Sequence, residues 1–210
     1  MLKLIYAAGT CALASHIALE EAGAEYECVR LDFRTSDQRK PEYLAINPKG
    51  RVPALVTDDG VLTETPAILA FVAQSFPSAR LAPATDPFAF ARVQAFNSYL
   101  CSTVHVAHAH RMRGYRWADD PAAIEEMRRK APAAVFECFD LIERQMISGP
   151  WVMGDAYTIC DPYLFTLAQW LEADGVDPAR LPKIRDHRSR MSERRAVKKA
   201  LADELGPARQ

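Results

Sequence analysis

The segment Asn47-Pro48-Lys49-Gly50-Arg51-Val52-Pro53-Ala54-Leu55 leads from a turn into an apolar strand. A proline just before such a strand is typical of a cis peptide bond in a tight turn. Val52 would then offer its backbone N–H and C=O to a peptide-like ligand, which would pair with it as one more extended strand. The alternative is an edge-strand proline that only starts the sheet. We favour the cis turn at Val52 and Pro53.

A β-hairpin and a helix are expected directly after this turn. Val52–Thr57 and Val61–Thr63 are apolar runs that flank Asp58-Asp59-Gly60, and Asp-Gly between such runs is a strong hairpin signal. The next helix is predicted to have Thr65 as its N-cap and Pro66 at its first helical position. This part of the chain is therefore predicted as β-β-α.

The residues before the turn predict a β-α-β unit. Leu2–Tyr6 and Tyr26–Leu31 have the character of short strands, and Cys11–Ala22 is expected to be a helix that ends at Gly23. Because a helix lies between them, the two strands are predicted to be parallel. The first 76 residues are thus expected to form an α/β half with the order β-α-β, an irregular stretch, and then β-β-α.

The sequence changes character after residue 76. Three prolines fall within residues 77–87, and this segment is expected to be a linker because each proline fixes φ and lacks a backbone donor. Apolar residues at three- and four-residue steps then predict an all-helical half over residues 88–210. Within it, Thr158 and Asp161 form a Thr-x-x-Asp capping box with a structural role.

Composition limits the classes of function. The chain has 210 residues, of which 49% are hydrophobic and 25% charged, and its formal net charge is -1. This balance argues against a nucleic-acid surface, and no apolar run approaches the roughly 20 residues that span a bilayer. Five cysteines without C-x-x-C pairing indicate a reducing, cytoplasmic location: Cys11, Cys28, Cys101, Cys138 and Cys160.

Cys11 is the first candidate for chemistry. It stands at the N-terminus of the first predicted helix, where N–H groups and the positive end of the helix dipole stabilise a thiolate. Thr10 can add a hydroxyl donor to a sulfur in the same turn. The alternative is that Cys11 is a small packing residue, but its position favours a functional role.

Glu64 and Thr65 place a carboxylate and a capping hydroxyl at a second helix N-terminus. Such a helix end binds a carboxylate through its N–H groups, while Glu64 could pair with an amine. Together they would form a site for an α-amino-acid head group. An ordinary N-cap beside a solvated acid is an equally good interpretation of these two residues.

Three histidines invite a metal interpretation, but their spacing argues against it. His105, His108 and His110 are three and two residues apart, whereas paired zinc ligands on a helix are four apart. No metal is therefore expected. His105 could face a cleft or be a hydrogen-bonded flank histidine.

The run Arg111–Trp117 mixes basic and aromatic residues, so it could line a substrate pocket or cover a helix end. The candidates for that pocket are His108, Arg111 and Tyr115.

Taken together, these motifs resemble the cytosolic glutathione transferases, most closely the bacterial beta class with an active-site cysteine. The best-matching stretches are residues 6–14, 16–23, 43–55 and 62–68, together with the capping box. The resemblance implies a thioredoxin-like, glutathione-binding domain over residues 1–76 and an all-helical domain over residues 88–210 that forms the electrophile site. It also implies a homodimer, because the family's site lies near the subunit interface.

The resemblance also implies roles for single residues. Cys11 would contact the glutathione sulfur or form a mixed disulfide with it. Val52 would bind the cysteinyl backbone, with cis-Pro53 shaping the turn. Glu64 and Thr65 would hold the γ-glutamyl head.

The helical half departs from the beta-class pattern. His105 falls where that class has a histidine pointing at the thiol site, but Val106 replaces the lysine that follows it. Ser98 replaces an asparagine that reaches the partner's glutathione. These changes suggest a relative of the class rather than a typical member.

The implied function is a glutathione transferase active in detoxification. It would use glutathione as cosubstrate, favour its thiolate through donors around Thr10 and Cys11, and conjugate it to a small electrophile. One alternative is a glutathione-dependent thiol–disulfide reductase that acts on mixed disulfides through Cys11. Since Ala14 stands where a resolving cysteine would be, that cycle would need a second glutathione. The other alternative is a non-catalytic ligand-binding or regulatory protein of the same fold.

Overall fold

The computed structural model describes residues 1–206, which form two compact units. Among the described residues, the first unit contains residues 1–90 and 192–206, and the second unit contains residues 91–191. This division differs from the one expected from sequence, in which everything after the proline-rich segment belongs to the helical half.

The C-terminal helix is responsible for that difference. Helix α9 (Arg195–Leu205) packs against α1 (Ala12–Ala22) of the first unit. Val197 and Ala200 of α9 are fully buried. Because its apolar side is covered by the first unit, the helix belongs to that unit although it is far from it in sequence.

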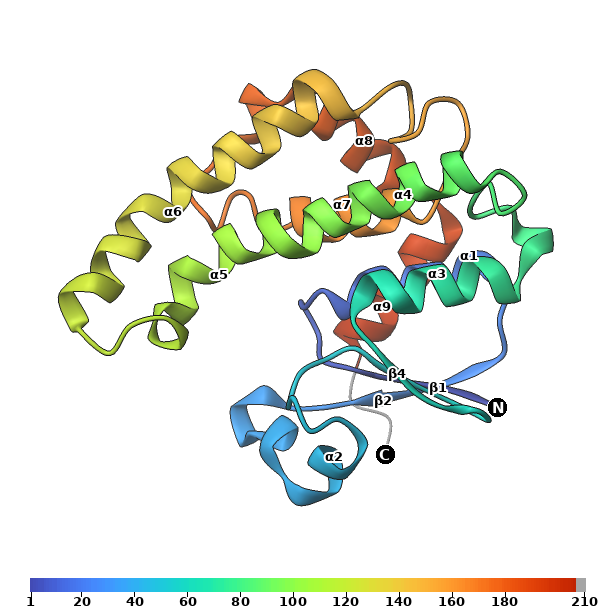
Figure 1. The fold of residues 1–210 in the computed structure, drawn as a ribbon, viewed down its shortest axis with the longest axis horizontal. Helices are drawn as coiled ribbons and strands as arrows, with labels where there is room; N and C mark the ends of the chain where they lie inside the picture. Colours follow the sequence, from blue (N-terminus) through green and yellow to red (C-terminus); the bar gives the residue numbers. More distant parts are fainter. Residues whose placement is uncertain (207–210) are drawn as a thin grey trace. The chain divides into compact units, whose positions relative to one another are not determined.

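The first unit is built on a four-stranded sheet with the order β2-β1-β3-β4 (Figure 1). Strand β1 (Leu2–Tyr6) pairs in parallel with β2 (Tyr26–Arg30). Strand β3 (Ala54–Thr57) pairs in antiparallel fashion with both β1 and β4 (Gly60–Thr63). This topology confirms the predicted α/β, thioredoxin-like class.

Two helices cover one face of the sheet, and α1 is the central element of the core. Figure 1 shows α1 and α3 (Thr65–Ser75) along one face, with α2 (Pro41–Ile46) on the other side. All residues from Ala12 to Leu19 are buried, because α1 lies against the sheet and also against α3 and α9. Gly23 ends α1 in the left-handed conformation, with φ 63°, as predicted.

The structure corrects two local expectations. The stretch predicted as irregular contains α2 and two short 3₁₀ turns, at residues 33–35 and 37–39. The prediction that Thr65 is an N-cap is wrong by one residue. Glu64 occupies the N-cap position of α3 with φ 71°, and Thr65 is the first helical residue. The turn from β4 into the helix therefore ends one residue earlier than the capping preference of threonine suggested.

The second unit is helical, as predicted. Its helices are α4 (Pro87–Tyr99, which begins in the first unit), α5 (His105–Arg113), α6 (Pro121–Leu141), α7 (Cys160–Ala168) and α8 (Pro182–Ser192). A π-helical turn at Leu100–Val104 joins α4 to α5, and α6 passes through Pro132. None of the helices in residues 1–206 has both the length and the apolarity needed to cross a membrane.

The predicted capping box at the start of α7 is confirmed, and it does more than cap. The N–H of Thr158 donates to Asp161 Oδ2 at 2.7 Å, and the N–H of Cys160 donates to Thr158 Oγ1 at 3.3 Å. Asp161 is fully buried and also accepts from the Val152 N–H at 2.9 Å. Its Oδ1 lies 3.0 Å from His187 Nε2 on α8. One carboxylate therefore links three segments of the second unit.

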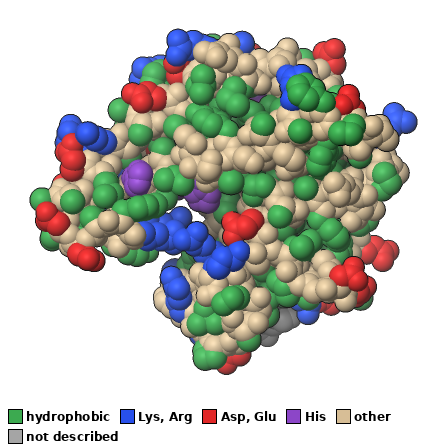
Figure 2. Space-filling model, viewed as in Figure 1, with side chains coloured by type: hydrophobic (Ala, Val, Ile, Leu, Met, Phe, Trp, Pro, Cys, Tyr) green, Lys and Arg blue, Asp and Glu red, His purple; other side chains and the backbone are tan. Residues whose placement is uncertain are grey.

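Charged side chains on the face drawn in Figure 2 are of both signs and lie among hydrophobic ones. This mixture agrees with the formal net charge of -1.

Candidate functional site

The turn between β1 and α1 is held by its own polar groups. Thr10 Oγ1 donates to the carbonyl of Ala7 at 2.7 Å and accepts from the N–H of Ala12 at 3.3 Å. The hydroxyl proton of Thr10 therefore goes to the backbone. Its predicted role as a donor to a sulfur would require the hydroxyl to rotate away from Ala7.

A carboxylate from α9 also contacts this turn, and the sequence did not reveal it. Glu204 Oε2 accepts from the N–H of Gly9 at 2.9 Å, and the side chain is nearly fully buried. Burial raises the pKa of Glu204 to about 7, against the lowering effects of the Gly9 hydrogen bond and of Arg30. Gly9 and Glu204 are 195 residues apart, so no local signal could have paired them.

Cys11 and Val52, which the sequence proposed as parts of one site, lie together. Cys11 occupies the N-cap position of α1, and its Sγ donates to the carbonyl oxygen of Val52 at 3.6 Å. The thiol is partly exposed. A nucleophilic atom at a helix N-terminus thus sits beside a backbone segment that could pair with an extended peptide.

The Val52–Pro53 peptide bond is cis, as predicted. The turn before it is fixed at the Arg51 carbonyl, which accepts from Tyr43 Oη at 2.5 Å and from Asn47 Nδ2 at 2.7 Å. Strand β3 begins only after this turn, at Ala54.

The third predicted element, at the start of α3, holds a paired carboxylate. Glu64 has a positive φ of 71°, which is uncommon for a residue with a side chain and costs about 1–3 kcal/mol. Its Oε1 lies 2.5 Å from Lys49 Nζ, which also donates to Thr63 Oγ1 at 2.7 Å. Thr65 is buried beside it. Glu64 therefore already pairs with an amine, as its chemistry suggested, but the amine is supplied by Lys49.

The second unit brings together a different group of side chains. Asp174 is only 2% exposed, and its Oδ2 lies 2.7 Å from His108 Nδ1. Its Oδ1 accepts from Arg111 Nε at 2.9 Å. Trp170 stacks on His108 with ring centroids 4.3 Å apart, and its ring centroid lies 5.3 Å from that of His105. The carboxylate orients the His108 ring through Nδ1.

The α5 members of this cluster were predicted from the sequence, but Asp174 and Trp170 were not. The three-residue spacing of His108 and Arg111 puts them on one helix face, which is a signal for a shared partner. Tyr115 lies beyond the end of α5 in a 3₁₀ turn and is 64% exposed, so it is a surface residue rather than a member of the buried cluster.

Comparison with known proteins gives a consistent result for both parts of the chain. The family described as Glutathione S-transferase, N-terminal domain, matches residues 3–74, and Glutathione S-transferase, C-terminal domain, matches residues 104–195. Glutathione S-transferase GstA from Escherichia coli O157:H7 is 33% identical over 206 residues, covering 97% of this chain and 98% of that protein.

Solved structures agree over nearly the whole length. A glutathione transferase homologue from Sulfitobacter, with bound glutathione, has a TM-score of 0.94 and 46% identity, covering 98% of this chain and 99% of that one. A beta-class glutathione S-transferase from Sphingomonas chungbukensis has a TM-score of 0.85 and 31% identity, covering 97% of this chain and 98% of that one. With the sheet topology, the cis turn at Val52 and the position of Cys11, these matches show that the chain belongs to the glutathione S-transferase family.

Proposed function

We propose that this protein binds glutathione in its first unit and transfers it to small electrophiles. The observation that carries the proposal is the 3.6 Å contact between the Cys11 thiol and the Val52 carbonyl, beside the cis peptide bond. A thiol-containing peptide that pairs with Val52 would bring its sulfur to the N-terminus of α1. The glutathione bound to the 46% identical Sulfitobacter homologue supports this choice of ligand.

Three parts of the first unit would hold the peptide. Val52 pairs with the cysteinyl backbone, and Pro53 shapes the turn that presents it. Glu64 and the N-terminus of α3, at Thr65, bind the amine and carboxylate of the γ-glutamyl head. The amine would replace or share the ion pair that Lys49 now makes with Glu64.

The reaction would need a glutathione thiolate. A thiol pKa lowered by about two units corresponds to about 2.7 kcal/mol of preferential thiolate stabilisation, which donors at a helix end can supply. Thr10 engages the Ala7 carbonyl, so the stabilising groups would be the positive end of the α1 dipole and the Cys11 thiol, which would turn from the Val52 carbonyl to the ligand sulfur once the peptide pairs with Val52. The thiol proton leaves to solvent, the sulfur forms a bond to the electrophilic carbon, and the leaving group departs with the electrons of the broken bond.

The second unit would supply the residues that bind the electrophile. We assign this role to His105, His108 and Arg111, which lie with Trp170 and Asp174, and leave out the exposed Tyr115. A cationic guanidinium and aromatic rings suit an aromatic or anionic electrophile. The protein would act as a cytoplasmic homodimer.

A second candidate function is glutathione-dependent disulfide reduction. The position of the Cys11 sulfur beside Val52 is where the cysteinyl group of a bound mixed disulfide would lie. The Cys11 thiolate would attack the glutathione sulfur, and the substrate thiolate would leave. The thiolate of a second glutathione would then attack the glutathione sulfur of the Cys11 mixed disulfide, which frees the Cys11 thiolate and forms oxidised glutathione.

The test compares the wild type with Cys11→Ala in three assays: glutathione binding, conjugation to an activated aryl halide, and reduction of a mixed disulfide. Cys138→Ala, which removes another partly exposed cysteine, is the control. Loss of reduction with conjugation intact would support the reductase role for Cys11. Loss of both would make Cys11 part of the conjugation site. Glutathione binding without turnover in the wild type would contradict the transferase proposal and indicate a binding protein, and no binding at all would refute the site.

A further inference from the structure

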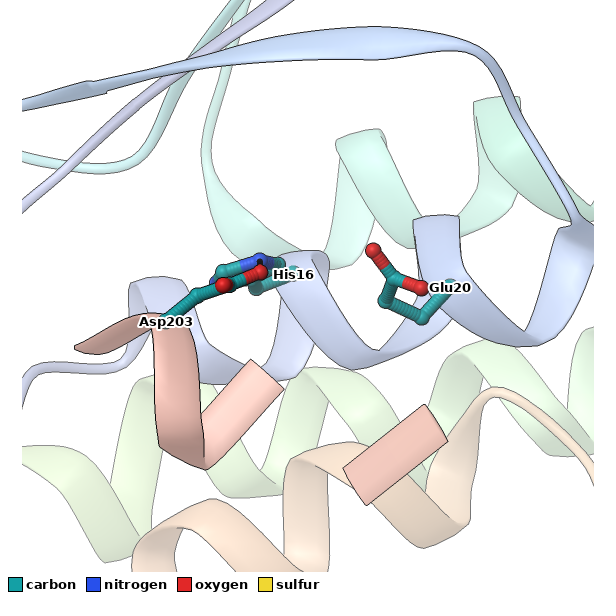
Figure 3. A group of neighbouring side chains, drawn as sticks. All are labelled: His16, Glu20 and Asp203. Atoms are coloured by element: carbon teal, nitrogen blue, oxygen red, sulfur yellow. Dashed lines mark ion pairs between the residues drawn. The ribbon is translucent and has the colours of Figure 1, made fainter. Parts of the chain in front are cut away.

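A separate group of metal-binding side-chain types lies in the first unit. His16 and Glu20 come from successive turns of α1, and Asp203 reaches them from α9 (Figure 3). The ligand atoms of these three residues all lie within 4.8 Å of one another. Cys28 on β2 adds a thiol, whose Sγ is 3.6 Å from His16 Nε2. None of the four belongs to the glutathione site proposed above.

These residues border a cavity that could admit an ion. The cavity has a volume of about 350 Å³, and Glu20, Cys28 and Asp203 line it. An ion with bound water needs only a small part of that space, because one water occupies about 30 Å³.

We propose that His16, Glu20 and Asp203 form a binding site for a divalent transition-metal ion of the Zn²⁺ type, with Cys28 as a further ligand. In tetrahedral zinc sites a nitrogen and a sulfur ligand are about 3.6 Å apart, and a nitrogen and an oxygen ligand about 3.4 Å apart. His16 Nε2 lies 3.6 Å from Cys28 Sγ and 3.8 Å from Asp203 Oδ2. Small side-chain adjustments would therefore complete the coordination.

The environment of His16 suits a ligand imidazole. The residue is fully buried, and its Nδ1 has no hydrogen-bond partner among residues 1–206, whereas Nε2 faces Cys28 and Asp203. Burial lowers the pKa of His16. The neutral ring is the form that binds metals.

Lys199 is a cation that now pairs with the carboxylates of this site, and Arg30 also lines the cavity. The Lys199 ammonium group pairs with Glu20, to which Tyr26 also donates, and lies 3.8 Å from Asp203 Oδ2. The Lys199 side chain is 55% exposed, so it could swing into solvent at little cost. A divalent ion would take its place between the two carboxylates. The alternative is a purely structural ion-pair cluster, in which Lys199 is the permanent cation.

The test titrates metal-free, full-length protein with zinc chloride in a calorimeter, without glutathione, whose thiol binds zinc itself. We expect saturable binding of one ion per chain. Asp203→Asn and Glu20→Gln should each weaken zinc binding by at least roughly 10–100-fold, because the loss of an outer-shell partner alone has an effect of that size. Glu25→Gln, which removes another carboxylate lining the same cavity, should leave the affinity unchanged. Lys199→Met should increase the affinity by removing the competing ammonium.

Cobalt(II) provides a second readout. A Co²⁺ complex with the Cys28 thiolate should absorb in the near ultraviolet through sulfur-to-metal charge transfer, and Cys28→Ser should abolish that band.

Three results would overturn the proposal. The first is that neither the wild type nor Lys199→Met binds zinc saturably. The second is that the zinc affinity is unchanged in both carboxylate variants. The third is that Cys11→Ala loses zinc binding, which would place the ion at the Cys11 thiol. Circular dichroism checks that each variant folds. If a carboxylate variant does not fold, the zinc affinity of Lys199→Met still tests the proposal. Because Cys11 and Val52 take no part, failure of this site would leave the proposed function untouched.

Discussion

In the first unit the backbone carries most of the candidate site, whereas in the second unit side chains carry it. The Cys11 thiol contacts the carbonyl of Val52 at a cis turn, with Cys11 at the start of α1 and Val52 just before β3. In the second unit, His108 and Arg111 are both held by one buried carboxylate, that of Asp174. A backbone site should tolerate changes of neighbouring side chains, while a cluster around one carboxylate should fail when that group is removed.

The largest expected effect tests how far the second unit depends on buried side chains. Asp161→Ala removes the acceptor of two backbone N–H groups and the partner of His187. We expect the free energy of unfolding, measured in urea, to fall by about 3–5 kcal/mol, because buried polar groups lose their partner. The exposed Asp155→Ala, in the segment before α7, should cost little. Equal losses for the two variants would contradict the comparison.

The next prediction concerns Glu204. Among the described residues of the first unit, it is the buried carboxylate that contacts the turn before Cys11. Its pKa of about 7 in the folded protein lies above that of an unfolded glutamate. Between about pH 4.5 and 7 the folded state keeps a proton that the unfolded state has released, so stability falls as pH rises through this window. Glu204→Gln removes this dependence and should stabilise the protein by up to about 3 kcal/mol at pH 8.

The free energy of unfolding of Glu204→Gln and of the wild type is measured in urea at pH 8 and at pH 4.5. The difference between the two proteins should nearly vanish at pH 4.5. The control is Glu193→Gln, an exposed carboxylate paired with Lys198. A difference between Glu204→Gln and wild type that is the same at both pH values would show that ionisation of Glu204 is not its cause.

A third prediction separates the two units by function. Asp174→Asn leaves the Arg111 guanidinium and the His108 ring without their charged partner, and we expect about 2 kcal/mol of lost stability. In steady-state conjugation assays the KM for the electrophile should rise, while the KM for glutathione stays near the wild-type value. Asp186→Asn, on the exposed face of α8, is the control. A change confined to the glutathione KM would refute the assignment.

The smallest expected effect is at Thr10. Thr10→Val removes the hydrogen bond to the Ala7 carbonyl and should cost about 1 kcal/mol of stability. If the backbone carries the site, glutathione affinity measured by calorimetry should change less than tenfold. Thr57→Val is the matched control, because Thr57 Oγ1 also donates to a backbone carbonyl, that of Gly60, and accepts from a backbone N–H, that of Asp59. Loss of glutathione binding in Thr10→Val alone would show that the hydroxyl acts on the ligand.

The accuracy of the sequence-based expectations follows the range of the interactions involved. The Asp58-Asp59-Gly60 hairpin, the Gly23 helix end and the cis bond before Pro53 were predicted correctly, because each depends on a few adjacent residues. The start of α3 was misplaced by one residue. There the conformation of Glu64 belongs to a turn that Lys49 also contacts, from 15 residues away.

The sequence alone determined the fold class, the order of the strands and of helices α1 and α3 in the first unit, and the cis turn before Pro53. Glycine and proline conformations, helix capping and apolar periodicity act over one or two turns of chain, so they can be recognised in a linear pattern. Tertiary structure alone decided that α9 joins the first unit, that Glu204 contacts Gly9 and that Asp174 orients His108. These pairings join residues more than 60 positions apart, and packing, not local preference, selects them.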